Sequence, residues 1–558
     1  MGIPEPQDIN LNFPSWRDAQ VRAIEWLHRP VYAVAKGHSA STSKDVGWLE
    51  TPFEERSISV LEAPPGTGKT GLILGLIAMN PHLRFLVLCA TKLEQAQYMR
   101  NMVEKEQDEV VEVKGKNNFH CILKHEDKRD ECESSECNLT HVNEAPCEAG
   151  FECPMKYGSN GCTYYEQRGR AKFAQAVISN YPYGLASLNY AHGIIGKFDV
   201  IVSDEGHVLD EQLEEFVKVK LSHRQFERLF SIELPSFIDG GDIPRWKSWA
   251  EDHINDLMAY MKDRFSEVPR DEMSITQMRQ YNGMQRNLNA LIKIRNMDEE
   301  WIVEEDSGGV EFQPVWVKEE SHKVLFSHAN RHVIMSGTIP SASELGKKIG
   351  LRAVDFDFLR LPYVFPPENR QIIIRPKVSL VRNDLQNNLP ALVSVIDEEI
   401  IERLREREIK ILIHTKTYEI TQYIKEHSQF RDIILTHRTA NRNAILQEFR
   451  NSSPPRILAS PSFDKAVDLP GDQCELIIIA KIPFPYLGTK VMQRRVKQSR
   501  RYYAHETLMS FIQMAGRGTR SEVDVCPTIV FDSASTRFLS QARSMIPKGI
   551  REAIREED

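Results

Sequence analysis

Apolar and polar residues alternate along the chain in two blocks, and each block predicts a parallel β-sheet with helices between its strands. In the first block, short apolar runs typical of buried strands occupy residues 57–61, 85–91, 177–179, 200–204 and 332–336. The second block has similar runs at residues 410–415, 433–436, 456–460, 475–482 and 528–532. Stretches with helical periodicity separate the runs. This alternation predicts an α/β fold with two doubly wound parallel sheets.

Two stretches interrupt the first block. Residues 112–170 are polar, rich in cysteine and poor in strand patterns. Residues 209–320 have mostly helical periodicity and many charged residues. Because strand-like runs resume after each stretch, both are predicted to be insertions into the first α/β domain.

The segment 61–70, with the sequence LEAPPGTGKT, joins the first predicted strand to a predicted helix at residues 71–79. A strand, a glycine-rich turn and a helix closing on Gly-Lys-Thr are typical of a phosphate-binding loop. In such a loop, backbone N–H groups and the helix N-terminus cradle the phosphates of ATP, the lysine reaches the β and γ phosphates, and the threonine hydroxyl binds Mg²⁺. The alternative is an ordinary glycine turn. The loop residues are Ala63 (where the motif has its first glycine), Pro64, Pro65, Gly66, Thr67, Gly68, Lys69 and Thr70.

A pair of carboxylates follows another predicted strand, in the sequence DEGH at residues 204–207. At the carboxyl end of a buried strand, Asp204 can hold Mg²⁺ while Glu205 orients and deprotonates the attacking water. A solvated acidic pair is the alternative, but the phosphate loop upstream favours the catalytic interpretation.

The sequence QMAGRGTR at residues 513–520 follows a helical stretch near the C-terminus. It contains Gln513 and two arginines, Arg517 and Arg520, that helical spacing would put one turn apart on one face. Two guanidinium groups so placed can stabilise the charge on a γ-phosphate from across an interface. The alternative is a pair of surface arginines.

The composition indicates a chain of several domains, 558 residues long, with a net charge of −8. It has no apolar run of 18 residues and no secretory signal, and Pro6 replaces the Ser or Thr of a myristoylation site. We therefore expect a cytoplasmic chain with no membrane partner. The net charge argues against a basic coat, but residues 490–503 (KVMQRRVKQSRRYY) are a candidate basic track for nucleic acid. A solvated helix face explains them equally well.

The nine cysteines are distributed unevenly, with six of them inside 42 residues. Because disulfides are rare in a reducing compartment, clustered thiolates predict a metal site, either zinc or an iron–sulfur cluster. The absence of a CxxC pair counts against an ordinary zinc ribbon. Cys89, Cys474 and Cys526 lie in or beside apolar runs, where cysteine is a small core residue. The six clustered residues are Cys121, Cys132, Cys137, Cys147, Cys153 and Cys162.

In this order, the phosphate loop, DEGH, Ser336-Gly337-Thr338 and QxxGRxxR resemble the XPD/DinG family of iron–sulfur DNA helicases in superfamily 2. Further similar segments are residues 115–121, 161–165, 180–181, 462–471 and 481–485. The resemblance implies two RecA-like motor domains, with a 4Fe-4S domain and a helical Arch domain inserted in the first. It also implies a monomeric enzyme that uses ATP and Mg²⁺ to move 5′-to-3′ on single-stranded DNA and to unwind forked or tailed duplex DNA.

The domain boundaries implied by the resemblance follow the two interruptions of the first block. Motor domain 1 would comprise residues 1–111, 171–208 and 321–355. The iron–sulfur domain would be residues 112–170, and the Arch domain residues 209–320. Motor domain 2 would be residues 356–558.

The resemblance also assigns roles to particular residues. Glu205 would be the general base, and Arg517, Arg520 and Gln513 would complete the catalytic site. Gln20 would recognise adenine, with an N-terminal helix surface as the alternative. The cluster ligands would be Cys121, Cys147, Cys153 and Cys162, which leaves Cys132 and Cys137 spare. A zinc site on the same thiolates remains the alternative.

The chain departs from the family pattern at two motifs. The usual DEAH is DEGH, so that Gly206 adds backbone freedom beside Glu205. The usual Trp-Glu-Gly of motif V reads Asp464-Lys465-Ala466, although Asp468 is retained. Two other functions stay open: a translocase or remodeller that does not unwind, and a non-catalytic binding protein of the same fold.

Overall fold

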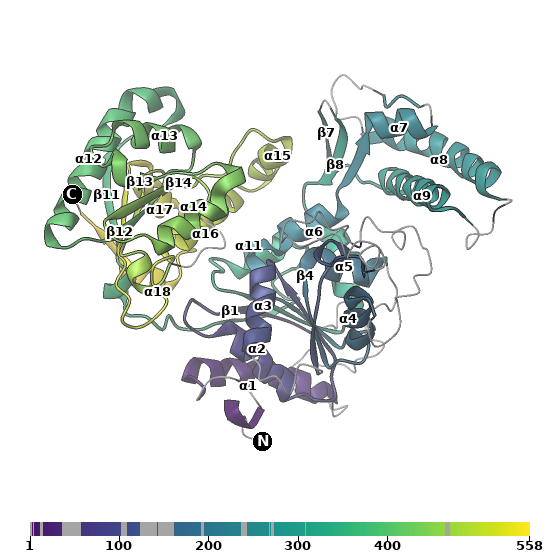
Figure 1. Cartoon of the computed structure of the whole chain (residues 1–558), viewed down its shortest axis with the longest axis horizontal. Helices are drawn as coiled ribbons and strands as arrows, with labels where there is room; N and C mark the ends of the chain where they lie inside the picture. The colour runs from purple at the N-terminus through teal and green to yellow at the C-terminus, as the bar shows by residue number, and fades with distance from the viewer. Residues whose placement is uncertain are drawn as a thin grey trace, which may run out of the picture.

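The structure is a computed structural model with two α/β lobes and a third lobe of helices and a small sheet (Figure 1). It describes residues 3, 5–9, 11, 15–35, 57–101, 109–122, 142, 161–190, 195–230, 232–235, 243–266, 268, 273–306, 308–463 and 469–557. The two α/β lobes confirm the predicted fold class.

The first α/β lobe contains a parallel sheet of seven strands in the order β10-β1-β9-β5-β2-β4-β3. The phosphate loop follows β1, DEGH follows β5, and Ser336 ends β9, which lies between them. Because parallel strands end at the same edge of a sheet, these three motifs lie together. The strands are β1 (Ser57–Glu62), β2 (Phe85–Cys89), β3 (Val110–Val113), β4 (Ala176–Asn180), β5 (Val200–Ser203), β9 (Arg331–Ser336) and β10 (Asp357–Arg360).

Helices cover both faces of this sheet, and two buried apolar clusters form its core. The helix α6, which starts two residues after His207, packs Leu209, Leu213 and Val217 into one of these clusters. The helices are α1 (Asp18–Ala35), α2 (Lys69–Ala78), α3 (Lys92–Arg100), α4 (Thr163–Ala171), α5 (Tyr181–Asn189), α6 (Leu209–Val217), α10 (Lys318–Val324) and α11 (Ala342–Lys348).

The second α/β lobe repeats the design with a parallel sheet in the order β13-β14-β12-β15-β16-β11-β17. Its strands are β11 (Ile372–Val378), β12 (Lys410–His414), β13 (Ile434–Leu435), β14 (Arg456–Ser460), β15 (Leu476–Ile479), β16 (Thr528–Asp532) and β17 (Ile554–Glu556). Its helices are α12 (Leu385–Glu406), α13 (Tyr418–His427), α14 (Arg442–Asn451), α15 (Lys490–Gln498), α16 (Arg500–Ala515), α17 (Ala534–Ala542) and α18 (Lys548–Ala553).

The third lobe lies at the upper right of Figure 1 and falls inside residues 209–320. Its long helices α8 (Ile243–Phe265) and α9 (Ile275–Arg295) and the shorter α7 (His223–Phe230) pack on an antiparallel sheet. That sheet has the order β6-β8-β7, from β6 (Val219–Ser222), β7 (Trp301–Asp306) and β8 (Gly309–Pro314). Trp246 is buried edge-on against Phe312, with ring centroids 5.0 Å apart.

The apolar runs in the sequence did not indicate several of the observed strands. The strands β3, β10, β11 and β17 lie at or near sheet edges, where their apolar patterns are short or interrupted by charges. The three antiparallel strands alternate buried and exposed residues within a region that was expected to be mostly helical. The first sheet also continues through β10, past residue 355. The domain boundaries themselves stay predictions.

Candidate active site

The loop between β1 and α2 has the backbone shape of a phosphate-binding loop. Gly66 and Gly68 have φ angles of 84° and 73°, which favour glycine. A Cβ at Gly66 would lie 2.1 Å from Cζ of Phe365, a residue of the segment that joins the two α/β lobes. The loop also closes on itself, because the Thr67 hydroxyl donates to the Pro64 carbonyl at 2.8 Å. Glycine is therefore required at Gly66 by conformation and by space.

The loop is held by contacts from two other elements. The Ala63 N–H donates to the Ser336 carbonyl at the end of β9, at 2.8 Å. The side-chain amide of Gln20, on α1, donates to the Gly68 carbonyl at 3.1 Å. The structure thus brings Gln20 to the phosphate loop, while its role in adenine recognition stays a prediction.

Asp204 is buried at the end of β5 and its oxygens are engaged on several sides. Its Oδ1 accepts from the Glu205 N–H at 2.9 Å, and its Oδ2 accepts from the hydroxyl of Tyr98 at 2.9 Å. Its backbone carbonyl accepts from the Tyr181 hydroxyl at 2.8 Å. No sequence motif indicates a role for either tyrosine, although Tyr181 belongs to a segment that resembles the family. These hydroxyls fix the orientation of Asp204.

Glu205 occupies the left-handed region, with φ of 50° and ψ of 44°. Few non-glycine residues adopt this conformation, and those that do are often found at functional sites. Its Oε2 lies 3.2 Å from Nδ1 of His207, which also lies 2.9 Å from the Ser336 hydroxyl. Its Oε1 makes an ion pair with the ammonium of Lys69. The Glu205 carboxylate therefore contacts the phosphate loop directly and the β9 motif through His207.

The charges of this site shift each other's pKa values. Burial disfavours the charged form of Lys69 and so acts to lower its pKa. The attraction of Glu205 and Asp204 for the ammonium is stronger than this effect, so the pKa of Lys69 is raised. Burial raises the pKa of Asp204 despite the nearby lysine. Burial also disfavours the charged form of Glu205, but Lys69 and His207 outweigh this effect and lower its pKa. Without nucleotide, Lys69 therefore serves as counter-ion to the carboxylates.

Gly206 is explained by space rather than by backbone freedom. The left-handed residue of DEGH is Glu205, whereas Gly206 begins the 3-10 turn Gly206–Val208. A Cβ at Gly206 would lie 2.4 Å from Cγ2 of Ile334 on β9. The departure from DEAH thus accommodates close packing of this turn on β9.

The second α/β lobe holds the arginines of the QxxGRxxR motif. Gln513 lies on α16, but this helix ends at Ala515, so Arg517 and Arg520 lie in the turn after it. The expectation that the arginines are spaced by a helical turn was therefore wrong. The Arg520 guanidinium donates to the Gly516 carbonyl at 2.6 Å, and the backbone N–H of Arg520 donates to the Asp524 carboxylate at 2.8 Å.

Arg517 is buried beside the carboxyl end of the central strand β12. Its carbonyl accepts from the Leu469 N–H at 3.2 Å. Burial and the positive charge of Arg517 lower the pKa of His414, at the end of β12, to about 3. His414 is therefore neutral near pH 7 and adds no positive charge beside Arg517. Whether Gln513, Arg517 and Arg520 act on ATP stays a prediction.

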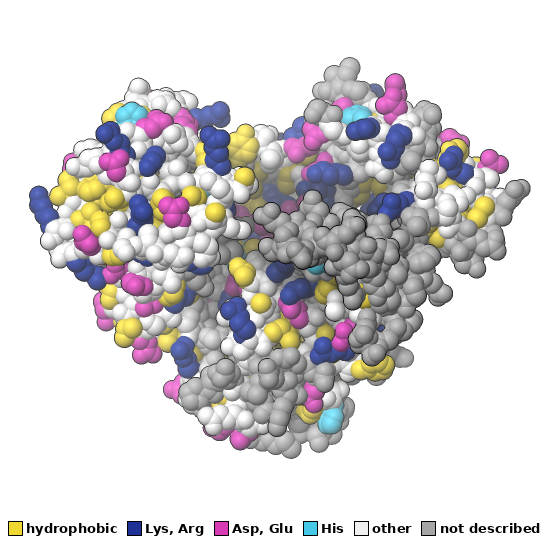
Figure 2. Space-filling model, viewed as in Figure 1, with side chains coloured by type: hydrophobic (Ala, Val, Ile, Leu, Met, Phe, Trp, Pro, Cys, Tyr) yellow, Lys and Arg dark blue, Asp and Glu magenta, His cyan; other side chains and the backbone are white. Residues whose placement is uncertain are grey.

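The basic stretch 490–503 forms α15 and the start of α16, and its residues differ in exposure. Arg494, Lys497, Arg500 and Arg501 are exposed. Arg495 is instead buried and forms an ion pair with Glu214 of α6. Figure 2 shows Lys and Arg side chains on both sides of the hollow between the left lobe and the lobe at the upper right. The stretch thus combines an exposed basic face with one structural arginine.

Two of the proposed cluster ligands lie within the described residues. Cys121 and Cys162 are both buried, in one small apolar cluster with Val142 and Tyr164. Cys147 and Cys153 lie outside the described residues, as do Cys132 and Cys137. Within the described ranges, no group of three or more His, Cys, Asp or Glu side chains is arranged to hold a metal. The motif V residues Asp464, Lys465, Ala466 and Asp468 also lie outside them.

Comparison with protein families gives two matches, one that covers part of the first α/β lobe without its phosphate loop and one that covers most of the second. The model named DEAD_2 matches residues 89–226, and the model of the helicase C-terminal domain matches residues 400–553. No curated protein sequence matches the chain significantly. Among the described residues, no helix is both long enough and apolar enough to cross a membrane.

Solved structures with a similar fold include three entitled as XPD proteins. One entitled XPD helicase is 14% identical with a TM-score of 0.58, and XPD4 from S. tokodaii is 15% identical with a TM-score of 0.56. An apo XPD structure is 14% identical with a TM-score of 0.54. In each case the similarity covers 97% of this chain and 100% of the other. At these identities the likeness is one of fold.

Proposed function

Because the chain belongs to the XPD/DinG-like helicases of superfamily 2, we propose that it couples ATP hydrolysis to movement along single-stranded DNA and to separation of duplex strands. Membership makes it an ATP-dependent nucleic-acid helicase. We further propose that its substrate is DNA, that it moves 5′-to-3′ and that it holds a 4Fe-4S cluster.

The contact between Lys69 and Glu205 carries the proposal for ATP hydrolysis. The phosphates of ATP would take the Lys69 ammonium from Glu205, because they carry more negative charge than one carboxylate. Loss of this counter-ion would raise the pKa of Glu205 and make it a stronger base for the attacking water. ATP binding would thus itself prepare the base.

The groups around this pair fit a magnesium nucleotide. The loop N–H groups and Thr70 would hold the phosphates and Mg²⁺, and Asp204 would bind the same ion, which supplies charge neutralisation on the phosphates. The Tyr98 hydroxyl on the Asp204 carboxylate supports this role, because bonded second-sphere groups orient a metal ligand, and the Tyr181 hydroxyl holds the backbone of the same residue. Arg517 and Arg520 would stabilise the transition state from the second motor domain, with Gln513 beside them.

The cysteine segment would hold a 4Fe-4S cluster on Cys121, Cys147, Cys153 and Cys162. The burial of Cys121 and Cys162 in one apolar cluster supports this proposal. Residues 112–170 contain few apolar side chains, so a metal would supply much of the order of this domain. The cluster would act as a structural staple in the element that separates the strands.

Strand displacement tests the helicase activity. The wild-type chain with ATP should release the labelled strand from a duplex with a 5′ single-stranded tail, and not from a matched duplex with a 3′ tail. Glu205→Gln, which should keep ATP binding, is the control for dependence on hydrolysis. Nucleic-acid-stimulated ATPase without strand release would favour a translocase or remodeller instead.

Metal analysis tests the cluster. Protein purified anaerobically should contain iron and sulfide, and Cys121→Ser should lose both together with unwinding. The ATPase activity measured without DNA should persist, because the motor domains have their own sheets and cores. Cys132→Ser and Cys137→Ser are matched controls that should keep iron and unwinding. Stoichiometric zinc without iron in the wild type would refute the cluster, and iron loss in Cys137→Ser would refute the choice of ligands.

A further inference from the structure

The helix α6 connects the hydrolytic carboxylate of the first motor domain to the interface with the second. It begins at Leu209, directly after the turn whose His207 touches Glu205. Asp210 and Glu214 are one helical turn apart on α6, and both make ion pairs at this interface. A displacement of α6 would therefore change the position of Glu205.

Two ionic contacts join α6 to α15 and α16. The ammonium of Lys348, on α11, lies 3.0 Å from Asp210 Oδ2 and 2.8 Å from Oε1 of Glu506 on α16. Lys348 is only 2% exposed. In the second contact, Glu214 pairs with Arg495 of α15. We call these five residues the α6 bridge: Asp210, Glu214, Lys348, Arg495 and Glu506.

The position of Arg495 is fixed by several neighbours. Its Nε donates to the Val315 carbonyl at 2.7 Å, and its Nη1 donates to the Tyr502 hydroxyl at 3.3 Å. Its guanidinium carbon lies 5.1 Å from the ring centroid of Trp316. Because these neighbours hold the guanidinium, it does not rotate freely, and a shift of α15 would also move α6.

The helices α15 and α16 also carry, or lead to, the residues whose action the bridge would link to Glu205. Glu506 lies two turns before Gln513 on α16, and the arginines follow the end of that helix. On α15, Arg494 and Lys497 are exposed and flank Arg495 in the sequence. The bridge thus stands between Glu205 on one side and both the arginines and an exposed basic face on the other.

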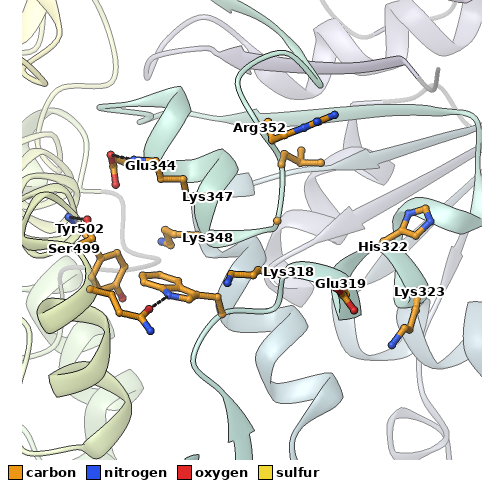
Figure 3. A pocket seen from close by; sticks show the side chains of 14 residues that line it. Lys318, Glu319, His322, Lys323, Glu344, Lys347, Lys348, Arg352, Ser499 and Tyr502 are labelled. Carbon is orange, nitrogen blue, oxygen red and sulfur yellow. Dashed lines mark hydrogen bonds and ion pairs between the residues drawn. The ribbon is translucent and has the colours of Figure 1, made fainter. Parts of the chain in front are cut away.

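The interface around the bridge is not a continuous apolar core. A cavity of about 750 Å³ lies beside it, lined by residues of α10, α11 and the junction of α15 and α16 (Figure 3). Lys348 and Tyr502 line this cavity from opposite domains. Beside this cavity, the two domains are joined by the ion pairs of the α6 bridge and by the edge-on contact of Trp316 with Tyr502, whose ring centroids lie 5.0 Å apart.

We propose that the α6 bridge couples nucleic-acid binding on α15 to ATP hydrolysis at Glu205, with Glu214 and Arg495 as positioning residues. The proposal rests on the proposed function, because it requires a helicase that nucleic acid stimulates. Phosphates bound by Arg494 and Lys497 would shift α15, and the Glu214–Arg495 pair would pass this shift to α6. The position of Glu205 relative to Arg517 and Arg520 would change with it.

The test compares ATP hydrolysis with and without single-stranded oligodeoxythymidylate in the full-length chain. Glu214→Gln should reduce the stimulation by DNA about five- to tenfold, the low end of coupling between sites. Its basal kcat, its KM for ATP and its affinity for DNA should stay within about twofold of wild type, because no substrate contact is removed. Glu215→Gln, on the same helix but 74% exposed, is the matched control.

Three outcomes would count against the bridge. Full stimulation of Glu214→Gln would overturn the coupling role, and an equal fall of basal and stimulated rates would assign the pair to fold stability alone. If Glu214→Gln does not fold, Glu506→Gln tests the other contact by the same measurements and with the same expected result. A wild-type chain that neither DNA nor RNA stimulates would refute the proposed function, and the coupling with it.

Discussion

The ATP-binding edges of the two motor domains differ in how much of their chemistry is already assembled. In the first domain, Lys69, Asp204 and Glu205 contact one another or share neighbours, and Tyr98 and His207 hold the carboxylates. In the second, the guanidinium of Arg520 donates to carbonyls of its own turn. If both motifs act on ATP, the first domain is prepared to bind the nucleotide, whereas the second would have to bring its arginines to it. Under the proposed function, binding needs one domain and hydrolysis needs both.

Removal of the base tests the first domain's side of this comparison. Glu205→Gln should lower kcat by about two to four orders of magnitude, because the water loses its base. ATP affinity should be kept or rise slightly, since the ion pair that competes for Lys69 is lost. Steady-state hydrolysis and equilibrium binding of a labelled ATP analogue measure the two effects. Turnover within about twofold of wild type would remove Glu205 from this role.

Removal of an arginine tests the second domain's side. Arg517→Ala and Arg520→Ala should each lower kcat by about tenfold to a hundredfold, less than a single arginine finger contributes, because two guanidinium groups share the charge. KM for ATP should change little, since the charge matters most in the transition state. Arg543→Ala, an exposed arginine of the same domain, is the control. Normal turnover with nucleic acid present would make the altered arginine a structural residue.

A smaller effect is expected when Asp204 loses one of its two tyrosine contacts. Tyr98→Phe removes the hydroxyl that donates to Oδ2, and should raise the Mg²⁺ concentration needed for half-maximal hydrolysis about tenfold. The kcat at saturating Mg²⁺ should be kept. Tyr190→Phe, at a tyrosine that is 62% exposed, is the matched control. An unchanged Mg²⁺ dependence would show that Tyr98 only packs against Asp204.

A different kind of effect concerns the stability of the first domain rather than catalysis. Burial raises the pKa of Glu62, at the end of β1, to about 7, despite its ion pair with Arg360. A folded-state pKa above the ordinary value means that stability is full below about pH 4.5 and is lost as pH rises through about 7, by no more than ~3 kcal/mol. Glu62→Gln should therefore lose less stability than wild type between about pH 5 and pH 8 in urea unfolding. Glu109→Gln, at an exposed residue, should behave as wild type.

The sequence predicts those parts of the site in which a single motif contains both the functional residues and the residues that set the backbone conformation. The phosphate loop and DEGH are such motifs, and they also predict the strands that precede them. The contacts of Tyr98 and Tyr181 with Asp204 join residues far apart in the chain, so no local pattern indicates them. The same holds for Arg495, whose burial the basic pattern around it concealed. Edge strands such as β10 and β17 were missed because their sequences are charged as well as short.

The most direct test of the divided site is the binding of a transition-state analogue. ADP with Mg²⁺ and fluoroaluminate imitates the γ-phosphoryl group in transfer, whereas a non-hydrolysable ATP analogue imitates the ground state. The wild type should bind the transition-state analogue at least about a hundredfold more tightly than the ground-state analogue. The double variant Arg517→Ala with Arg520→Ala should lose most of this preference and keep ground-state binding. An undiminished preference in the variant would contradict the account, because the first domain alone would then supply the transition-state contacts.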